Sequence, residues 1–258
     1  MIREKRFFVR DQDFKSKRIV LSSEESHHLK NVLRGKKGDP VILFNGEGEE
    51  FTGQVASLGP GNAVIAIEKK RRERIRGAIS IVLVQALPKK KKMDFVIAKA
   101  CELGVEEVMP LETDRTECKL GQAQLKRVSE RWERIAVQSC KQSCLDWVPL
   151  IHPPATFKEM IHRVKGFEAV LIPHPDEAMP KFSEVIAEVK ARVGKTSKPA
   201  MPRKIAVVIG PEGGFSDREI ALANEHGLNF VYLGDLVLRT ETASIVAVSL
   251  VKYAFNLC

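Results

Sequence analysis

Hydrophobic and polar positions divide the chain into two regions of different periodicity. In roughly the first 70 residues, short apolar or alternating runs predict strands at 6–9, 40–44, 51–58 and 63–68. Glycine-rich turns separate these runs, and one short helix is expected at 27–34. Many short strands with frequent turns favour a small β-barrel.

From residue 78 onward, strands alternate with helices. The continuous apolar run 79–87 indicates a strand buried on both faces. Further strands are expected at 107–111, 168–173, 204–210 and 230–234, and helices at 94–103, around Trp132, and at 182–189, 216–227 and 242–255. This alternation predicts a parallel sheet with helices on both faces. We therefore expect two domains, at 1–73 and 74–258.

Charge and cysteine usage narrow the class of protein. A formal net charge of +9 favours polyanionic partners. The charge run 69–74 is interpreted as a solvated linker or a strap facing such a partner, with the linker favoured. Five cysteines, of which Cys140 and Cys144 have helical spacing, suggest neither a disulfide framework nor a zinc site, so no metal is expected. The charged start of the chain and the lack of a long apolar run favour a cytoplasmic protein.

The first motif with possible chemistry joins a buried strand to a capped helix through the turn Gly210-Pro211-Glu212-Gly213-Gly214. Ligands of open α/β sheets bind beyond the carboxyl ends of strands, where this turn lies. It matches neither a phosphate loop nor a dinucleotide fingerprint, and Glu212 favours a neutral or cationic ligand over a polyphosphate. The alternative is a tight turn that binds nothing.

The second motif, Arg239-Thr240-Glu241-Thr242, follows another strand and opens an apolar helix. Thr240 or Thr242 would cap that helix, and Glu241 suits its positive end. Those helix roles leave Arg239 unexplained, because a cation is unfavourable at a helix N-terminus. An anion facing Arg239, such as a phosphate, would account for it.

Together the two motifs closely resemble the SPOUT class of knotted methyltransferases, and within it the 16S ribosomal RNA uracil-N3 methyltransferase family. Weaker matches run over nearly the whole chain, among them residues 6–8, 28–29, 32–34, 92–94, 102–105 and 174–175. Lys141 and Leu145 depart from the family, many members of which carry a glutamate and an arginine at those places. This departure leaves the RNA contacts near those positions open.

The resemblance implies an α/β fold, with a C-terminal trefoil-knotted SPOUT domain built on a mostly parallel sheet and a small N-terminal PUA-like β-barrel. It also implies a homodimer that binds S-adenosyl-L-methionine in the knot. The expected cofactor-binding residues come from three loops and the helix that follows them: Ile172, His174, Pro175, Ile209, Gly210, Pro211, Glu212, Gly213, Gly214, Leu233, Gly234, Leu236, Val237, Leu238, Thr242 and Ala243.

The implied reaction transfers a methyl group to N3 of a uridine in 16S rRNA, within the small ribosomal subunit. Because N3 carries a proton, Arg239 is expected to stabilise the developing uracil anion or to hold a nearby phosphate. Glu241 is a conceivable base, although its helix role is favoured. The expected RNA contacts are basic: Arg6, Arg10, Arg34, Lys89, Lys90, Lys91, Lys92 and Arg115.

Three other functions are compatible with parts of the pattern. The first is a methyltransferase of another RNA, such as tRNA. The second is a non-catalytic RNA-binding protein of ribosome assembly, against which the intact motifs at 210–214 and 239–242 argue. The third, a nucleotide-dependent hydrolase, is disfavoured by the lack of a phosphate loop.

Overall fold

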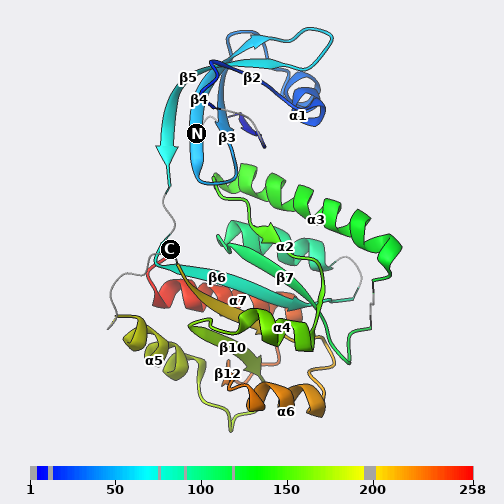
Figure 1. Ribbon diagram of the computed structural model, residues 1–258, viewed down its shortest axis with the longest axis vertical. Coiled ribbons are helices and arrows are strands. Elements are labelled where there is room, and N and C mark those ends of the chain that lie inside the picture. Colours follow the sequence, from blue (N-terminus) through cyan, green and yellow to red (C-terminus); the bar gives the residue numbers. More distant parts are fainter. Residues whose placement is uncertain are drawn as a thin grey trace. The chain divides into compact units, whose positions relative to one another are not determined.

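The structure is a computed structural model that describes residues 5–10, 14–74, 77–89, 92–117, 120–194 and 202–257 (Figure 1). The chain forms two compact units. One contains residues 1–75 and 137–148, and the other contains 76–136 and 149–258. The first unit therefore includes a segment, 137–148, that lies far along the sequence from its strands.

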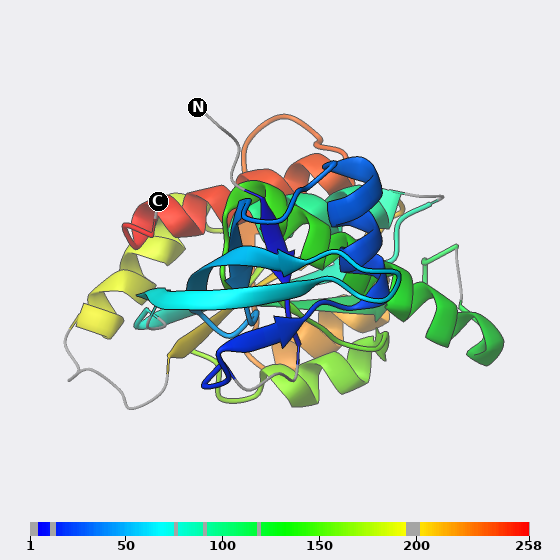
Figure 2. The same cartoon turned by 90° about the horizontal axis from the view of Figure 1, so that it is seen from above.

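The N-terminal unit is a curled five-stranded sheet. Its strands are β1 (Arg6–Phe8), β2 (Arg18–Val20), β3 (Pro40–Phe44), β4 (Glu49–Ser57) and β5 (Val64–Glu73), in the order β1-β3-β4-β5-β2. The long strands β4 and β5 pair in antiparallel fashion and run side by side in Figure 2. A core that includes Phe7, Leu43 and Ile65 is enclosed by this sheet. The prediction of a small, turn-rich β unit is confirmed.

Three details of this unit differ from the sequence prediction. No strand was expected at β2, which pairs with β5. The helix begins earlier, as α1 (Ser23–His27) and the π-helical turn η1 (His28–Val32), because Ser22 accepts a hydrogen bond from the Glu25 amide and caps it. The linker prediction for 69–74 was wrong, since β5 continues to Glu73. Its cations face carboxylates: Lys70 Nζ lies 2.7 Å from Glu49 Oε1 on the paired strand.

The C-terminal unit contains a seven-stranded sheet in which every strand pair is parallel. Its order is β12-β10-β11-β6-β7-β8, with β9 also paired to β7. The strands are β6 (Ile79–Ala86), β7 (Glu107–Glu112), β8 (Leu150–Ile151), β9 (Ala155–Thr156), β10 (Ala169–His174), β11 (Arg203–Ile209) and β12 (Asn229–Tyr232). The helices are α2 (Lys92–Glu102), α3 (Gln122–Ser143), α4 (Phe157–Val164), α5 (Phe182–Gly194), α6 (Asp217–Glu225) and α7 (Thr240–Ala254). The part of α3 from residue 137 onward belongs to the first unit. The predicted α/β fold with a parallel sheet is confirmed.

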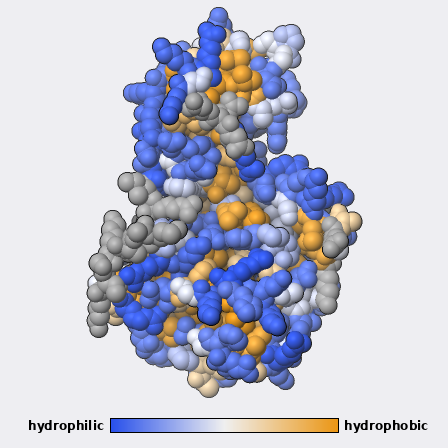
Figure 3. Space-filling view, in the orientation of Figure 1, coloured by the Kyte–Doolittle hydropathy of each residue, from blue (hydrophilic) through white to orange (hydrophobic). Residues whose placement is uncertain are grey.

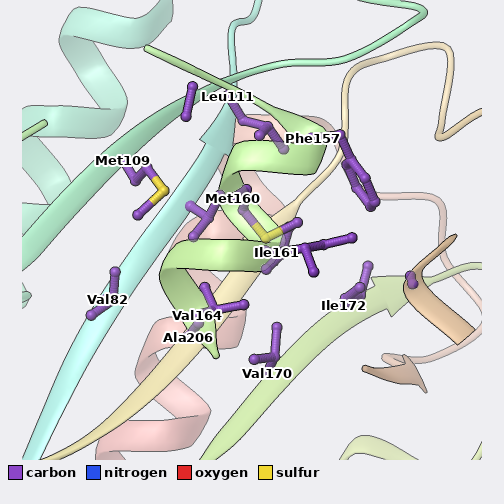
Figure 4. Packing of buried hydrophobic residues seen from close by; sticks show 14 of the residues in the cluster. Val82, Met109, Leu111, Phe157, Met160, Ile161, Val164, Val170, Ile172 and Ala206 are labelled. Atoms are coloured by element: carbon purple, nitrogen blue, oxygen red, sulfur yellow. The ribbon is translucent and has the colours of Figure 1, made fainter. Parts of the chain in front are cut away.

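Alternate residues of the central strands form the core on one face of the sheet. Val82 and Val84 of β6, with Val170 and Ile172 of β10, join side chains of α4 and α6 in one cluster. Figure 4 shows the α4 side chains gathered over these strands. Each such side chain contributes about 1.5–3 kcal/mol when fully buried. Helix α7 packs against strands β6 and β11 and lies next to helices α2 and α5.

Within the part of this unit that the structure describes, α4 is the one helix that the sequence pattern missed. It begins with a capping box: Thr156 Oγ1 accepts from the Glu159 amide, and Glu159 accepts from the Thr156 amide. Most of the polar loop expected at 194–203 lies outside the described residues. Within the described parts of the chain, no helix has the length and apolarity needed to cross a bilayer. Hydrophilic residues cover much of each unit in the face shown in Figure 3.

One cluster at the amino edge of the sheet joins β7, β11 and the residue that follows β8. Glu107, at the start of β7, lies 2.8 Å from His152 Nε2 and 2.5 Å from Lys204 Nζ of β11. The hydrogen bond with His152 lowers the pKa of Glu107 to about 2, against the opposing effect of burial and with further help from Lys204. Because the folded-state pKa is depressed, this stabilisation is complete above the ordinary pKa of 4.5. It is lost as pH falls towards 2.

We expect Glu107→Gln to lower the free energy of unfolding by about 2–3 kcal/mol at pH 7, since one pKa unit corresponds to ~1.4 kcal/mol. The difference from wild type should shrink between about pH 4.5 and pH 3. Urea unfolding of both proteins across this range measures it. A deficit that stays constant with pH would show that the ionised carboxylate is not its source.

Candidate functional site

A cavity of about 620 Å³ lies at the carboxyl ends of β10, β11 and β12. Three segments form most of it: 173–175 at the end of β10, 209–215 at the end of β11 and 233–239 after β12. β10 lies between β11 and β12 in the sheet, so the three loops emerge at one edge. The two motifs singled out in the sequence thus meet in space.

The turn 210–214 after β11 depends on glycine at its first and last positions. A Cβ atom on Gly210 would lie 2.9 Å from the Phe215 ring, which leaves no room for a side chain. Phe215 in turn packs edge-on against Phe157, with ring centroids 5.5 Å apart. Gly214 has a φ of 69°, a left-handed conformation that favours glycine. The chain therefore turns sharply into α6 with its backbone exposed to the cavity.

Buried hydrogen bonds tie this loop to the start of α7. The Gln85 side chain, fully buried on β6, donates from Nε2 to Thr240 Oγ1 at 2.9 Å and to the Ala86 carbonyl at 3.0 Å. Thr240 Oγ1 donates to the Gly210 carbonyl at 3.1 Å. Ser244 Oγ lies within hydrogen-bond distance of Gln85 Oε1 and completes the amide's partners. One hydroxyl thereby fixes the position of the two cavity loops relative to each other.

The loop after β12 is held at its other end. Tyr232, the last residue of β12, donates its hydroxyl to Asp235 Oδ1 at 2.5 Å, and this bond raises the pKa of Tyr232 to about 12. Gly234 has a φ of 128°. Beyond it, Leu236 and Val237 are 80% and 88% exposed at the rim of the cavity. These apolar side chains are available to cover a ligand or a second molecule.

Lys92 links the two motifs by charge. Its Nζ lies 3.4 Å from Glu212 Oε1 and 3.3 Å from Glu241 Oε2. Burial would raise the pKa of Glu241, but its own backbone N–H, Lys92 and Arg239 outweigh that effect and leave the pKa below its ordinary value. Glu241 is therefore ionised at neutral pH and is a poor proton acceptor.

Two arginines border the cavity. Arg239 is the N-cap residue of α7, is exposed, and makes no side-chain capping bond. The expectation that Thr240 or Thr242 caps this helix was wrong: Thr240 is already the first helical residue, and its hydroxyl bonds to Gly210 instead. Arg115 Nη1 donates to the Gly213 carbonyl at 3.1 Å. Both guanidiniums lie where an anionic group at the mouth of the cavity would meet them.

Most of the expected cofactor-binding residues line the cavity: His174, Pro175, Ile209, Gly210, Pro211, Glu212, Gly214, Leu233, Gly234, Leu236, Val237, Leu238 and Ala243. Ile172 is fully buried in the core beneath it, and Gly213, Thr242 and Glu241 are outside the lining. Four lining residues were not expected there: Phe215, Asp217, Ile220 and Thr240. The capping box at Ser216 could have indicated Asp217 and Ile220, because it places both in the first turn of α6 beside the loop.

The predicted RNA contacts fall into different settings. Arg6 is 5% exposed, pairs with Glu50 and donates to the Leu145 carbonyl, so burial assigns it a structural role instead. Arg10 and Arg34 are exposed in the N-terminal unit. Lys89 is exposed and bonded to Glu117, near Glu212, while Lys90 and Lys91 lie outside the described residues.

Lys141, one of the departures from the family pattern, is also internal. Its Nζ lies 2.7 Å from Glu25 Oε2, and both side chains are 8% exposed. The position that was left open as an RNA contact is therefore a buried ion pair within the N-terminal unit.

We expect Thr240→Val to lower the free energy of unfolding by about 1–3 kcal/mol, because the Gln85 amide and the Gly210 carbonyl both lose a buried partner. Thr242→Val, at an exposed position of the same helix, is the matched control and should change it by less than about 0.5 kcal/mol. Chemical denaturation of the three proteins makes the comparison. Equal stability of the two variants would remove Thr240 from the architecture of the site.

Both parts of the chain are similar to known protein families. Residues 76–252 match the family described as the RNA methyltransferase domain, and residues 21–68 match the RNA methyltransferase PUA domain. A relative from Synechocystis, ribosomal RNA small subunit methyltransferase E, is 31% identical over 90% of this chain and 71% of its own. The protein of the same name from Bacillus subtilis is 27% identical over 92% and 90% of the two chains.

Solved structures of methyltransferases are similar to this chain over nearly its whole length. A methyltransferase from Legionella pneumophila, in complex with the cofactor SAM, superposes with a TM-score of 0.85 at 30% identity over 98% of each chain. A ribosomal RNA small subunit methyltransferase E from Neisseria gonorrhoeae, bound to S-adenosyl methionine, gives 0.80 at 27% identity over 97% of each chain. With both parts of the chain matched, the protein belongs to the ribosomal RNA small subunit methyltransferase E family.

Proposed function

We propose that this protein transfers the methyl group of S-adenosyl-L-methionine to N3 of one uridine in 16S rRNA. The observation that carries the proposal is the cavity at the carboxyl edge of the sheet, where the loops after β11 and β12 meet and Arg239 borders the opening. The relatives' names supply the RNA class, and the resemblance in the two motifs supplies the atom that is methylated.

The cavity suits this cofactor in size and chemistry. Its volume of about 620 Å³ lies within the range of ~300–1,000 Å³ found for small-molecule sites. The lining offers Leu233, Leu238 and Ile220 to an adenine ring. Carboxylates of Glu212 and Asp217 and guanidiniums of Arg115 and Arg239 are also present. A ligand that combines a sulfonium, an ammonium and a carboxylate finds partners of both signs there.

When bound, S-adenosyl-L-methionine supplies an electrophilic methyl group. The three loops and Ala243 would hold it, with the backbone groups at Gly210, Gly214 and Gly234 close to the ligand. Ile172 would act from beneath by packing in the core that supports His174, whose ring stacks edge-on against Phe230 at 5.7 Å. Much of the acceleration would come from holding donor and acceptor in line.

Arg239 and Glu241 would have distinct tasks. The Arg239 cation would stabilise negative charge on the uracil as N3 loses its proton, or hold an adjacent phosphate. Glu241 keeps Lys92 in place rather than taking the proton, because its pKa is already low. The target base must leave its pairing partner to expose N3. Arg10, Arg34, Lys89, Lys92 and Arg115, with Lys90 and Lys91, are proposed RNA contacts that position it.

The same resemblance implies a domain architecture and an oligomeric state for this protein. Residues 1–73 would form the PUA-like RNA-binding barrel, and 74–258 the SPOUT domain with its trefoil knot. A homodimer would cover the apolar side chains left exposed at the cavity rim, Leu236 and Val237, and on α7, Leu250 and Tyr253. Because the substrate is ribosomal RNA, the protein would act in the cytoplasm.

Mass spectrometry of ribosomal RNA from a strain that lacks this gene tests the proposal directly. We expect loss of 3-methyluridine from one position of 16S rRNA and its return when the wild-type gene is restored. Loss of a methyl group from tRNA instead would identify the alternative substrate. Unchanged RNA, together with no uptake of S-adenosyl-L-methionine by calorimetry, would identify a non-catalytic binding protein.

We expect Arg239→Ala to keep cofactor affinity near that of wild type while turnover falls by about 10²-fold or more, the usual cost of removing one charge-stabilising donor. Arg218→Ala, at an exposed arginine of α6 outside the cavity lining, is the control and should retain wild-type turnover. Single-turnover methylation with calorimetry separates the two quantities. Wild-type turnover in Arg239→Ala would remove this residue from the mechanism.

A further inference from the structure

The charge run of β5 is organised by carboxylates that lie beneath it. Arg71, Arg72 and Arg74 keep 38%, 40% and 40% of their side-chain area exposed. Glu50 and Asp146, which they contact, are both fully buried. The flank of the N-terminal unit along β5 is hydrophilic in Figure 3. All of these residues belong to the same compact unit.

A β-bulge brings two consecutive arginines to one carboxylate. In the β4–β5 register, Glu50 is opposite Arg72 and Phe51 is opposite Lys70, so Arg71 is the extra residue. Consecutive side chains of a regular strand point to opposite faces, but a bulge redirects one of them. Arg71 Nε and Arg72 Nη2 therefore both approach Glu50 Oε1, at 3.4 Å and 3.6 Å.

Asp146 holds the other end of the row. Its Oδ2 lies 3.7 Å from Arg72 Nε, and its Oδ1 lies 3.7 Å from Arg74 Nε. The backbone fixes this arrangement: the Gly48 amide donates to the Asp146 carbonyl at 3.0 Å, and the Arg74 amide donates to the Gly48 carbonyl at 2.8 Å. A buried carboxylate is costly unless charges surround it. Within the described residues neither Asp146 oxygen has a hydrogen-bond partner, so charge attraction draws the arginines towards it.

Among the contacts of the described residues, guanidiniums outnumber carboxylates in this cluster. Arg6 also pairs with Glu50 from inside the unit, so four guanidiniums surround two carboxylates. At Arg71 and Arg74 the contact to the carboxylate is made through Nε, at the base of the guanidinium. The exposed parts of the three side chains thus form a basic row on a rigid strand.

We propose that Arg71, Arg72 and Arg74, oriented from below by Glu50 and Asp146, bind the phosphodiester backbone of the RNA substrate. This inference rests on the proposed function, because it assigns a surface to that substrate. Arginine suits phosphate since its planar group donates two parallel hydrogen bonds. Side chains held in place before binding lose less entropy when the phosphates arrive. Phosphate contacts of this kind fix the position and register of the RNA.

The first test removes the charge of the row. Binding of wild type and of the triple variant Arg71→Gln/Arg72→Gln/Arg74→Gln is measured across salt concentrations. The probe is a 16S rRNA fragment that carries the uridine methylated by the wild-type enzyme. Each phosphate contact contributes about 0.7–0.9 to the salt slope, so we expect the slope to fall by about two and the affinity at least tenfold.

The charge-matched control is Lys17→Gln/Lys36→Gln/Lys37→Gln, at three exposed lysines of the same unit. A triple arginine variant with the slope of wild type or of this control overturns the proposal. The two hypotheses fail differently. Wild type that methylates no ribosomal RNA refutes the proposed function, whereas wild type that methylates normally beside a fully binding arginine variant refutes this inference alone.

The second test isolates orientation from charge. Asp146→Asn removes a negative charge from a basic surface, so simple electrostatics predicts tighter RNA binding. Our proposal predicts the opposite, a severalfold loss, because Arg72 and Arg74 lose the group that positions them. Circular dichroism and S-adenosyl-L-methionine binding, which takes place in the other unit, check that the variant is folded. Unchanged or tighter RNA binding would overturn the role of Asp146.

A third variant, Arg71→Lys/Arg72→Lys/Arg74→Lys, keeps every charge and leaves the buried carboxylates neutralised, so it is the variant most able to fold. We expect a salt slope close to that of wild type with affinity reduced several-fold, because lysine lacks the planar pair of donors. Affinity equal to that of wild type would contradict the proposal that each guanidinium donates two parallel hydrogen bonds to a phosphate.

Discussion

The site depends on one buried amide having all its partners. Gln85 lies on the central strand β6 with no exposed surface, and an unsatisfied amide there would cost about 1–3 kcal/mol. It reaches Thr240 at the start of α7, and Thr240 reaches the Gly210 carbonyl at the end of β11. Residues 155 positions apart along the chain are thus joined at the point where the ligand would bind. The rest of the cavity is arranged around loops whose separation this contact sets.

In both units, ionised side chains lie in contact with several groups of the opposite charge. At the cavity, Lys92 lies between Glu212 and Glu241, so each motif contributes one carboxylate to the same ammonium. Along β5 the signs are exchanged: each buried carboxylate is contacted by two or more exposed guanidiniums. The net charge of +9 therefore says little by itself about where a polyanion binds. Counter-charges within the fold decide which cations are used internally, as Arg6 and Lys141 are.

The main outlines of the fold could be predicted from sequence because they follow from local periodicity, whereas the list of expected site residues came from the resemblance of the two motifs to a known family. The fully buried run of β6, the alternation of strands and helices, and the glycine turn at 210–214 each leave a pattern within about ten residues. Burial of Arg6 could not be foreseen, since its partner Glu50 is 44 residues away and its acceptor Leu145 is 139 residues away. The extension of β5 through a charge run was missed because the compensating carboxylates belong to β4 and to the segment 137–148.

Because the segment 137–148 belongs to the first unit, the chain passes between the two compact units three times. It leaves the first unit after residue 75, returns to it at 137 and leaves it again after 148. Asp146 and Trp147 belong to the first unit, and Trp147 bridges to Gly46 and Glu47. During synthesis, the N-terminal strands emerge from the ribosome well before these residues do. The carboxylate that Arg72 and Arg74 surround is then still untranslated, so this unit completes its packing only after half of the chain has been made. A fragment cut after residue 75 would never reach that stage, whatever the intrinsic stability of its sheet.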